Sequence, residues 1–359
     1  MRLVSLSMLK PDMVLAKAIY YKDCLVLREG ISDLHRFSKS LKNLGIDYVY
    51  ISDAKSDGIN IPDAISEETR VNCKKILRQT IDDFENKAVV DLSEMSGTIN
   101  NIIDEILANP DVQVSLNDIS ASDEYTFSHS VSTTVYSLLI AKDLGYNRQM
   151  LEKLATGTLL HDFGKVMIDK KILNKQGELS PEELEHVKQH TTFGYELLKK
   201  CSSLTELSRI IALQHHERMD GSGYPGGHKA GELHEFARIV AIADVYDALI
   251  SDRCYRKKWS CNNAVNYLVE HAETKFDLKL VSILIKQIAI YPNGSMVRLS
   301  TNAMGIVKEQ NKNFPLRPVI RVITDENGND IIPYEVDLMQ MLSITILESE
   351  LEMESFDKI

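Results

Sequence analysis

Side chains that could bind metal gather in the middle of the chain. Eight of the ten histidines lie between His129 and His234. Five of them and two aspartates fall at the ends or inner faces of successive predicted helices: His129, His161, Asp162, His190, His215, His216 and Asp244. Burying so many polar groups is costly unless something pairs them. A mixed imidazole and carboxylate set suits divalent iron, manganese or similar ions, and a carboxylate beside a histidine can bridge two ions, as two-metal phosphoryl chemistry requires.

A mostly helical region must position these ligands. From 112 to about 290, apolar residues recur at i, i+3, i+4 and i+7, as in VYSLLIAKDLG and LEKLATGTLLHDFG, which is typical of amphipathic helices. Ser180 and Pro181 predict a helix start, with the serine as N-cap and the proline at the first helical position.

The flanking regions have other patterns. Apolar runs broken by Pro11, Asp23 and Gly30 predict short strands, and 32–44 predicts a helix with Ser32 as a possible cap and Gly45 as its stop. After Gly294, β-branched runs predict a small sheet. We therefore predict a mainly α protein with four parts: a small α+β module (1–62), a helical connector (63–112), a helical domain (113–290), and a β extension with an acidic tail (291–359).

Composition and charge exclude several functions. The 359 residues carry 41 Lys+Arg against 52 Asp+Glu, a net charge of −11, which argues against general nucleic-acid binding. No run of 18 apolar residues or signal-peptide core is found, so we expect no membrane insertion. The five cysteines form no CxxC pair, which is typical of reduced thiols and predicts a cytoplasmic location.

Six motifs in the central region closely resemble the HD-GYP family. They are YTxxHS (125–130), HDFGK (161–165), HxxxG (190–194), HHERMDGSGYP (215–225), ADVYDAL (243–249) and DRxYRK (252–257). The resemblance covers about residues 115–290. The family is the branch of the HD phosphohydrolase superfamily that hydrolyses the bacterial second messenger cyclic di-GMP. It implies an HD-type helical catalytic core with a GYP loop.

The resemblance also implies roles for individual residues. One metal ion would be held by His129, His161, Asp162 and Asp244, and a second by Asp162, His190, His215 and His216. Asp162 and Lys165 would be catalytic, with the Lys165 ammonium facing the scissile phosphate. The remaining contacts with the substrate would come from Tyr224, from Asp247 on the guanine side, and from Arg253 and Arg256, whose guanidinium groups suit anions.

The reaction implied is hydrolysis of cyclic di-GMP by a metal-activated hydroxide, giving pGpG and, after a second cleavage, GMP. The ions would be iron or manganese. Some family members bind a third ion and have a glutamate four residues before the first histidine. Here Tyr125 holds that position, and Glu124 is one residue off, rotated by about 100° on an ideal helix. We therefore expect two ions and pGpG as the main product.

Two alternative functions stay open. The chain could be a receptor that binds cyclic di-GMP with little turnover, or an HD phosphohydrolase acting on another cyclic dinucleotide. The N-terminal module (1–62) resembles the small domain that often precedes HD-GYP units. We expect it to serve regulation, either through a signalling partner or by forming a homodimer.

Several other features have simpler explanations. Gly221, Gly223 and Gly226 match the dinucleotide-binding pattern GxGxxG but follow a predicted helix, so we interpret them as a turn. His186 has metal-pair spacing with His190, yet lies in a charged helix and is expected to be exposed. Structural or surface roles are also expected for His228, His234, His35, His271 and Cys254.

Overall fold

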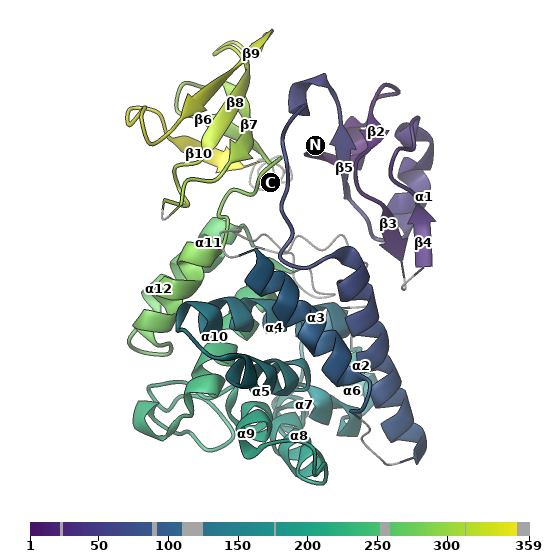
Figure 1. Ribbon diagram of the computed structural model, residues 1–359, viewed down its shortest axis with the longest axis vertical. Helices are drawn as coiled ribbons and strands as arrows, with labels where there is room; N and C mark the ends of the chain where they lie inside the picture. Colours follow the sequence, from purple (N-terminus) through teal and green to yellow (C-terminus); the bar gives the residue numbers. More distant parts are fainter. Residues whose placement is uncertain are drawn as a thin grey trace.

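The computed structural model describes residues 1–21, 24–87, 92–109, 125–175, 177–251, 259–312 and 314–349. A large helical body lies below two smaller β-containing parts, one formed by the beginning of the chain and one by its end (Figure 1). The mainly α fold, with an α+β module before the helices and a β extension after them, is therefore confirmed.

The N-terminal module contains two small sheets and one short helix. The first is antiparallel, in the order β1 (Arg2–Ser5), β5 (Tyr48–Ser52), β2 (Val14–Leu15), and the second is the hairpin β3 (Ile19–Tyr21) and β4 (Cys24–Leu27). The predicted helix is shorter than expected, because α1 covers only Ser38–Asn43 after a 3₁₀ turn, Leu34–Phe37. Ser32 is not its cap, since Asp33 precedes the turn. Gly45 does end the helix, with φ of +77°, a conformation that favours glycine.

The connector region contains two helices, α2 (Glu67–Lys87) and α3 (Met95–Ala108). One face of α3 is buried, through Ile99, Ile102, Ile103 and Ile106, and joins the core of the helical body. Both helices contact α4. The connector is thus part of the helical packing as well as a link along the chain.

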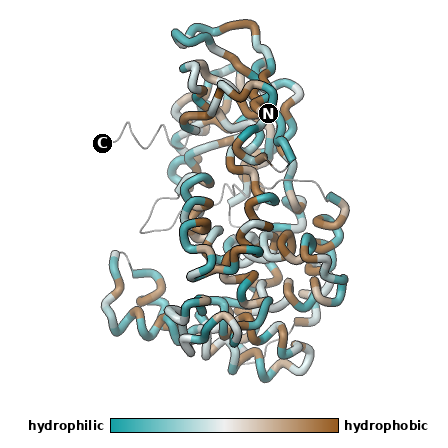
Figure 2. Tube along the Cα trace, turned by 90° about the vertical axis from the view of Figure 1, so that its left-hand side faces the viewer, coloured by the Kyte–Doolittle hydropathy of each residue, from teal (hydrophilic) through white to brown (hydrophobic). Residues whose placement is uncertain are grey.

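Helix α4 lies at the centre of the helical body. Its residues 128–141 are all buried, and its Tyr136 packs edge-on against Tyr246 of α10, with ring centroids 5.0 Å apart. Along the surrounding helices hydrophobic and hydrophilic stretches alternate (Figure 2), as expected for helices with one buried face. The helices are α4 (Tyr125–Asp143), α5 (Arg148–Leu159), α6 (Lys170–Leu173), α7 (Pro181–Lys188), α8 (His190–Leu198), α9 (Glu206–Gln214), α10 (Glu235–Ile250), α11 (Cys261–Glu270) and α12 (Leu278–Gln287).

The predicted start of α7 is confirmed. The Ser180 hydroxyl accepts a hydrogen bond from the Glu183 amide at 3.2 Å, and the Glu183 carboxylate accepts one from the Ser180 amide at 2.7 Å. This reciprocal arrangement is a capping box, with Pro181 in the first turn.

The C-terminal extension is a five-stranded antiparallel sheet that packs against the N-terminal module. The amide of Leu3 donates to the carbonyl of Gly294 at 3.0 Å, and Ile59 packs with Ile306 and Ile323. This contact between the two ends of the chain was not predicted from the sequence. The strands lie in the order β10 (Ile346–Ser349), β6 (Met296–Leu299), β7 (Met304–Glu309), β8 (Val319–Thr324), β9 (Asp330–Asp337).

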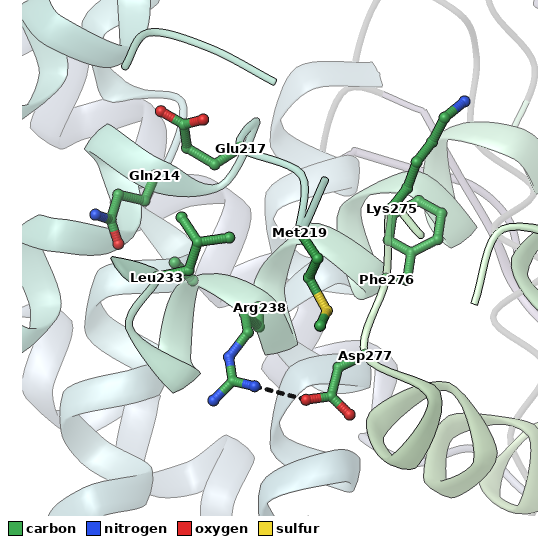
Figure 3. A pocket seen from close by; sticks show the side chains of 10 residues that line it. Gln214, Glu217, Met219, Leu233, Arg238, Lys275, Phe276 and Asp277 are labelled. Atoms are coloured by element: carbon green, nitrogen blue, oxygen red, sulfur yellow. Dashed lines mark hydrogen bonds and ion pairs between the residues drawn. The ribbon is translucent and has the colours of Figure 1, made fainter. Parts of the chain in front are cut away.

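A buried carboxylate holds the loop between α9 and α10. Glu217 is 2% exposed and accepts hydrogen bonds from the amides of Gly226, at 2.7 Å, and His228, at 3.0 Å. Its side chain lines a small pocket beside Met219 and Phe276 (Figure 3). The loop therefore has a fixed course, although most of its residues lack regular secondary structure.

A second close contact fixes the segment that follows α5. The 3₁₀ helix Phe163–Met167 packs on α8 so tightly that a Cβ atom on Gly164 would lie 2.0 Å from the His190 carbonyl oxygen and 2.4 Å from the Gly194 nitrogen. Only glycine fits here without a shift of the backbone.

We predict that Gly164→Ala destabilises the protein by about 1–3 kcal/mol or more, because overpacking forces the backbone apart. Gly97→Ala is the matched control, since a methyl group added to Gly97, in α3, would have no neighbouring atom within 4 Å. That change should stabilise the protein by about 0.5–1 kcal/mol. Urea unfolding followed by circular dichroism measures both, and equal stability of Gly164→Ala and the wild type would contradict the close contact.

We also predict that Glu217→Gln loosens the loop at a cost of about 1.5–3 kcal/mol, since hydrogen bonds to charged groups are strong. Glutamine offers one acceptor oxygen for two buried amides. Amide hydrogen exchange at Gly226 and His228 should become faster. In the control Glu196→Gln, the altered side chain lies on α8, is 60% exposed and pairs with Lys199, so exchange at those two amides should not change.

Candidate metal centre

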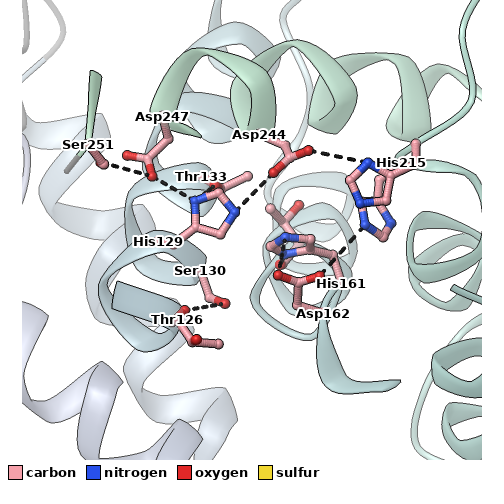
Figure 4. Close-up of polar contacts among 12 residues, drawn as sticks. Thr126, His129, Ser130, Thr133, His161, Asp162, His215, Asp244, Asp247 and Ser251 are labelled. Carbon is pink, nitrogen blue, oxygen red and sulfur yellow. Dashed lines mark hydrogen bonds and ion pairs between the residues drawn. The ribbon is translucent and has the colours of Figure 1, made fainter. Parts of the chain in front are cut away.

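The seven predicted metal ligands come together from five parts of the helical body. Figure 4 shows His129, His161, Asp162, His215 and Asp244 among them. Helix α4 supplies His129, and α10 supplies Asp244. His161 and Asp162 follow the end of α5. Helix α8 begins with His190, and His215 and His216 follow α9. Residues up to 115 positions apart in the sequence thus meet at one place.

These ligands form two groups with Asp162 between them. The ligand atoms of Asp162, His190, His215 and His216 lie within 4.8 Å of one another, as do those of His129, His161 and Asp244. Asp162 belongs to the first group, but its Oδ2 lies 3.4 Å from His161 Nε2 of the second. Its Oδ1 lies 3.3 Å from His190 Nε2. The carboxylate thus presents one oxygen to each group.

Backbone carbonyls orient three of the histidines. In each, Nδ1 contacts a carbonyl oxygen three or four residues earlier, which favours the tautomer with the proton on Nδ1 and leaves Nε2 with a lone pair for a metal ion. The contacts are His161 with Thr158 at 2.7 Å, His190 with Val187 at 2.7 Å, and His215 with Ile211 at 3.0 Å. The helix ends therefore set the direction of the imidazole rings.

Burial keeps most of these imidazoles neutral. It lowers the pKa of His190 to about 4, and it also lowers the pKa values of His161, His215 and His216. A neutral imidazole is the form that binds metal. His129 is the exception: burial alone would lower its pKa, but hydrogen bonds with two aspartates raise it to about 9.

The carboxylates remain ionised. Burial would raise the pKa of Asp162, but Lys165 and the neighbouring histidines outweigh that effect and hold it well below the usual value. Lys165 Nζ lies 2.5 Å from Asp162 Oδ2. Burial would likewise raise the pKa of Asp244, yet the hydrogen bond with His129 and further histidines hold it well below the usual value.

Two buried atoms of the centre lack a hydrogen-bond partner. They are His161 Nε2 and Asp162 Oδ1. Unpaired buried polar atoms are rare in folded proteins. Both are good ligand atoms for a divalent ion, and each belongs to a different group. The side chains therefore fit a pair of divalent ions, and a set of imidazole and carboxylate ligands suits several metals.

Of the residues expected to contact the substrate, some lie beside the metal ligands and others lie outside the described residues. Lys165 is about 30% exposed, and the Tyr224 ring stacks on His216 with centroids 4.8 Å apart, so both lie beside the metal ligands. Arg253 and Arg256 lie outside the described residues, as do Cys254 and Glu124. Tyr125 begins α4.

Lys188 was missed by the sequence analysis. Its Nζ lies 5.6 Å from the centre of the Tyr224 ring, at the end of the helix before His190. No motif of the family resemblance includes this lysine, so the sequence contained no signal for its position.

The histidines given simpler explanations belong to neither group. His186 is half-buried rather than exposed, with Nδ1 3.2 Å from Gln189 Oε1. His234 caps α10 by accepting from the Phe236 amide at 3.1 Å. Gly221, Gly223 and Gly226 lie in the loop between α9 and α10. The element directly before them is a helix, whereas the dinucleotide-binding pattern follows a strand, so that interpretation is excluded. Among the described clusters of metal-ligand type, none includes His228, His35 or His271.

Asp247 is buried beside one of the candidate metal ligands. Its side chain is 2% exposed, and its Oδ2 is 2.7 Å from His129 Nδ1. The contact with His129 connects Asp247 with the candidate metal ligands.

A membrane span is not found in the described part of the chain, where every helix is too short or too polar for one.

Comparisons with known proteins agree with this centre. Residues 114–280 match the HD domain, and residues 296–355 match a KOW domain associated with the HD domain. Cyclic di-GMP phosphodiesterase PA4108 of Pseudomonas aeruginosa is 34% identical over 247 residues, 69% of this chain and 59% of that protein. The response regulator RpfG of Xanthomonas campestris, also a cyclic di-GMP phosphodiesterase by name, is 39% identical over 149 residues, 41% of this chain and 39% of that protein.

A third relative is 3'3'-cGAMP-specific phosphodiesterase 3 of Vibrio cholerae, 34% identical over 175 residues, 49% of this chain and 38% of that protein. The chain thus spans about three fifths or less of the length of these relatives. Among solved structures, Bd1817 of Bdellovibrio bacteriovorus, an HD-GYP-type protein, has a TM-score of 0.51 and 21% identity over 79% of this chain and 97% of that one, a likeness of fold. Residues 114–280 of this chain are thus an HD domain, and its motifs are similar to those of the HD-GYP family.

Proposed function

We propose that the protein is a metal-dependent phosphodiesterase that hydrolyses cyclic di-GMP. The observation that carries the proposal is the position of Asp162, whose two carboxylate oxygens face two separate groups of metal-ligand side chains. The names of two relatives support the choice of substrate.

The chain's own residues would divide the work as follows. His129, His161 and Asp244 would hold one ion, His190, His215 and His216 would hold the other, and Asp162 would be a ligand shared by the two groups. Bound divalent ions lower the pKa of water and offset phosphate charge. Lys165 adds a positive charge at the same edge of the centre, where negative charge develops on the phosphate oxygens. Tyr224 provides an aromatic face for a nucleotide.

We propose two ions per chain, iron or manganese, with pGpG as the main product. The described ligands account for two groups of three or four side chains. A third ion would need a ligand near the start of α4, such as Glu124.

A second cyclic dinucleotide belongs in the test. The Vibrio cholerae relative is named as specific for 3'3'-cGAMP, and a metal centre acts on the phosphodiester that both dinucleotides share. Base preference must come from other contacts, for which Tyr224, Arg253 and Arg256 are the proposed residues.

Two further parts of the proposal concern the protein's surroundings. The four described cysteines form no disulfide with one another, which favours a reducing compartment such as the cytoplasm. The N-terminal module would bind a signalling partner or a second copy of the chain. Its strand β4 has two exposed apolar side chains, Leu25 and Val26, and exposed apolar strands favour such contacts.

We predict that the wild type, purified anaerobically with iron or manganese, binds two ions and converts cyclic di-GMP to pGpG. His161→Ala and Asp162→Ala should lose bound metal and lower turnover by more than about 100-fold, because even outer-shell changes cost 10- to 100-fold. His186→Ala is the matched control, since His186 belongs to neither group, and it should behave as the wild type. Elemental analysis and chromatography of the nucleotides provide the measurements.

The outcomes separate the possible functions. Fully loaded wild type that binds cyclic di-GMP without turnover would support the receptor and contradict the enzyme. Faster turnover of 3'3'-cGAMP than of cyclic di-GMP in a competition assay would contradict the proposed substrate. The proposed reaction, hydrolysis of a cyclic dinucleotide, would still stand.

A further inference from the structure

His129 differs from the other oriented histidines of the centre in what holds its ring. His161, His190 and His215 rest on backbone carbonyls, whereas Nδ1 of His129 lies 2.7 Å from a carboxylate oxygen of Asp247. A carboxylate is a charged acceptor and forms a stronger hydrogen bond than a carbonyl. The ring of His129 is therefore supported differently from those of the other three histidines.

The position of Asp247 follows from helix geometry. It lies three residues after Asp244 on α10, so both carboxylates emerge on the same side of the helix and face α4. The His129 ring lies between them, with Nε2 2.9 Å from Asp244 Oδ1 and Nδ1 turned to Asp247 (Figure 4). Ser251, one turn further along, donates its hydroxyl to Asp247 Oδ2 at 3.4 Å.

Burial strengthens the hydrogen bond between His129 and Asp247. His129 is 3% exposed and Asp247 is 2% exposed, so the hydrogen bond is shielded from water and electrostatically strong. With Nδ1 donating to Asp247, Nε2 is the ring atom that would give up its proton and bind a metal ion beside Asp244. Carboxylates in this position fix the tautomer and raise the basicity of a ligating imidazole.

We propose that Asp247 is a positioning residue, which orients His129 toward the ion held by His129, His161 and Asp244, and is not a contact to the nucleobase. The inference rests on the proposed function in one respect, that the chain binds divalent metal. Its effect should fall on one of the two ions, because His190 and His215 in the other group are oriented by the backbone carbonyls of Val187 and Ile211.

The test is Mn²⁺ binding to the full chain, measured by calorimetry and by electron paramagnetic resonance of the free ion. The wild type should bind two ions. Asp247→Asn keeps the shape but removes the charge, and Asp247→Ala removes the acceptor as well. Both variants should lower the affinity for one of the two ions by about 10- to 100-fold, and the alanine variant more than the asparagine variant. The affinity for the other ion should not change. If the alanine variant does not fold, the nearly isosteric asparagine variant still tests whether Asp247 positions His129.

Asp277→Asn is the matched control. Asp277 also contacts α10, through Arg238 at 2.6 Å, but belongs to neither group of ligands. A general loosening of α10 would lower the melting temperature of both asparagine variants, whereas only Asp247→Asn should change metal affinity.

Three results would be decisive. Weakening of a single ion in Asp247→Asn, with the control unchanged, supports the positioning role. Two unchanged affinities together with a raised KM for cyclic di-GMP would overturn it and restore the substrate contact. A wild type that binds no Mn²⁺ at all would overturn the metal-dependent function itself, and with it this inference.

Discussion

The burial of one ionised carboxylate, Asp162, is the constraint on which the centre depends. A buried charge is costly unless other groups compensate it. Here Lys165 supplies a positive charge on one side, and neutral histidines surround the rest. The compensation remains incomplete within the chain, since Asp162 Oδ1 has no hydrogen-bond partner. A cation between the histidines would complete it, so the same arrangement that costs folding free energy favours metal binding.

The scaffold holds these groups through contacts that tolerate little change. Gly164 brings the segment carrying Asp162 against the backbone of α8 at His190, which keeps the two ligands together. Glu217 holds the following loop through two backbone amides, and that loop carries Tyr224. Each contact uses a residue next to the ligands in sequence. The precision of the centre thus comes from backbone packing near each ligand, and not from the ligands alone.

The sequence allowed most of the ligand set to be predicted because ligands leave a strong local signal. Histidines next to aspartates in a helical, apolar region are costly without a function, and the motifs set their order. Other features could not be predicted because their signal lies in three dimensions. Asp247 follows Asp244 in a way that suits either a substrate or His129, and only the orientation of α10 against α4 distinguishes the two. Lys188, at the end of α7, lies over the ring of Tyr224, which belongs to a loop 36 positions later in the sequence. The contact between Leu3 and Gly294 joins residues with no pattern in common.

Helix α4 connects the centre with both ends of the chain. It carries His129, packs against α10, and contacts α2 and α3 of the connector on one side and α12 on another. The connector leads back to the N-terminal module, and α12 leads on to the C-terminal sheet, while module and sheet pack on each other through Ile59, Ile306 and Ile323. Both routes from the β-containing parts therefore end on the helix that positions His129. His129, on α4, and Asp247, on α10, are 2.7 Å apart, so their hydrogen bond depends on how these two helices pack.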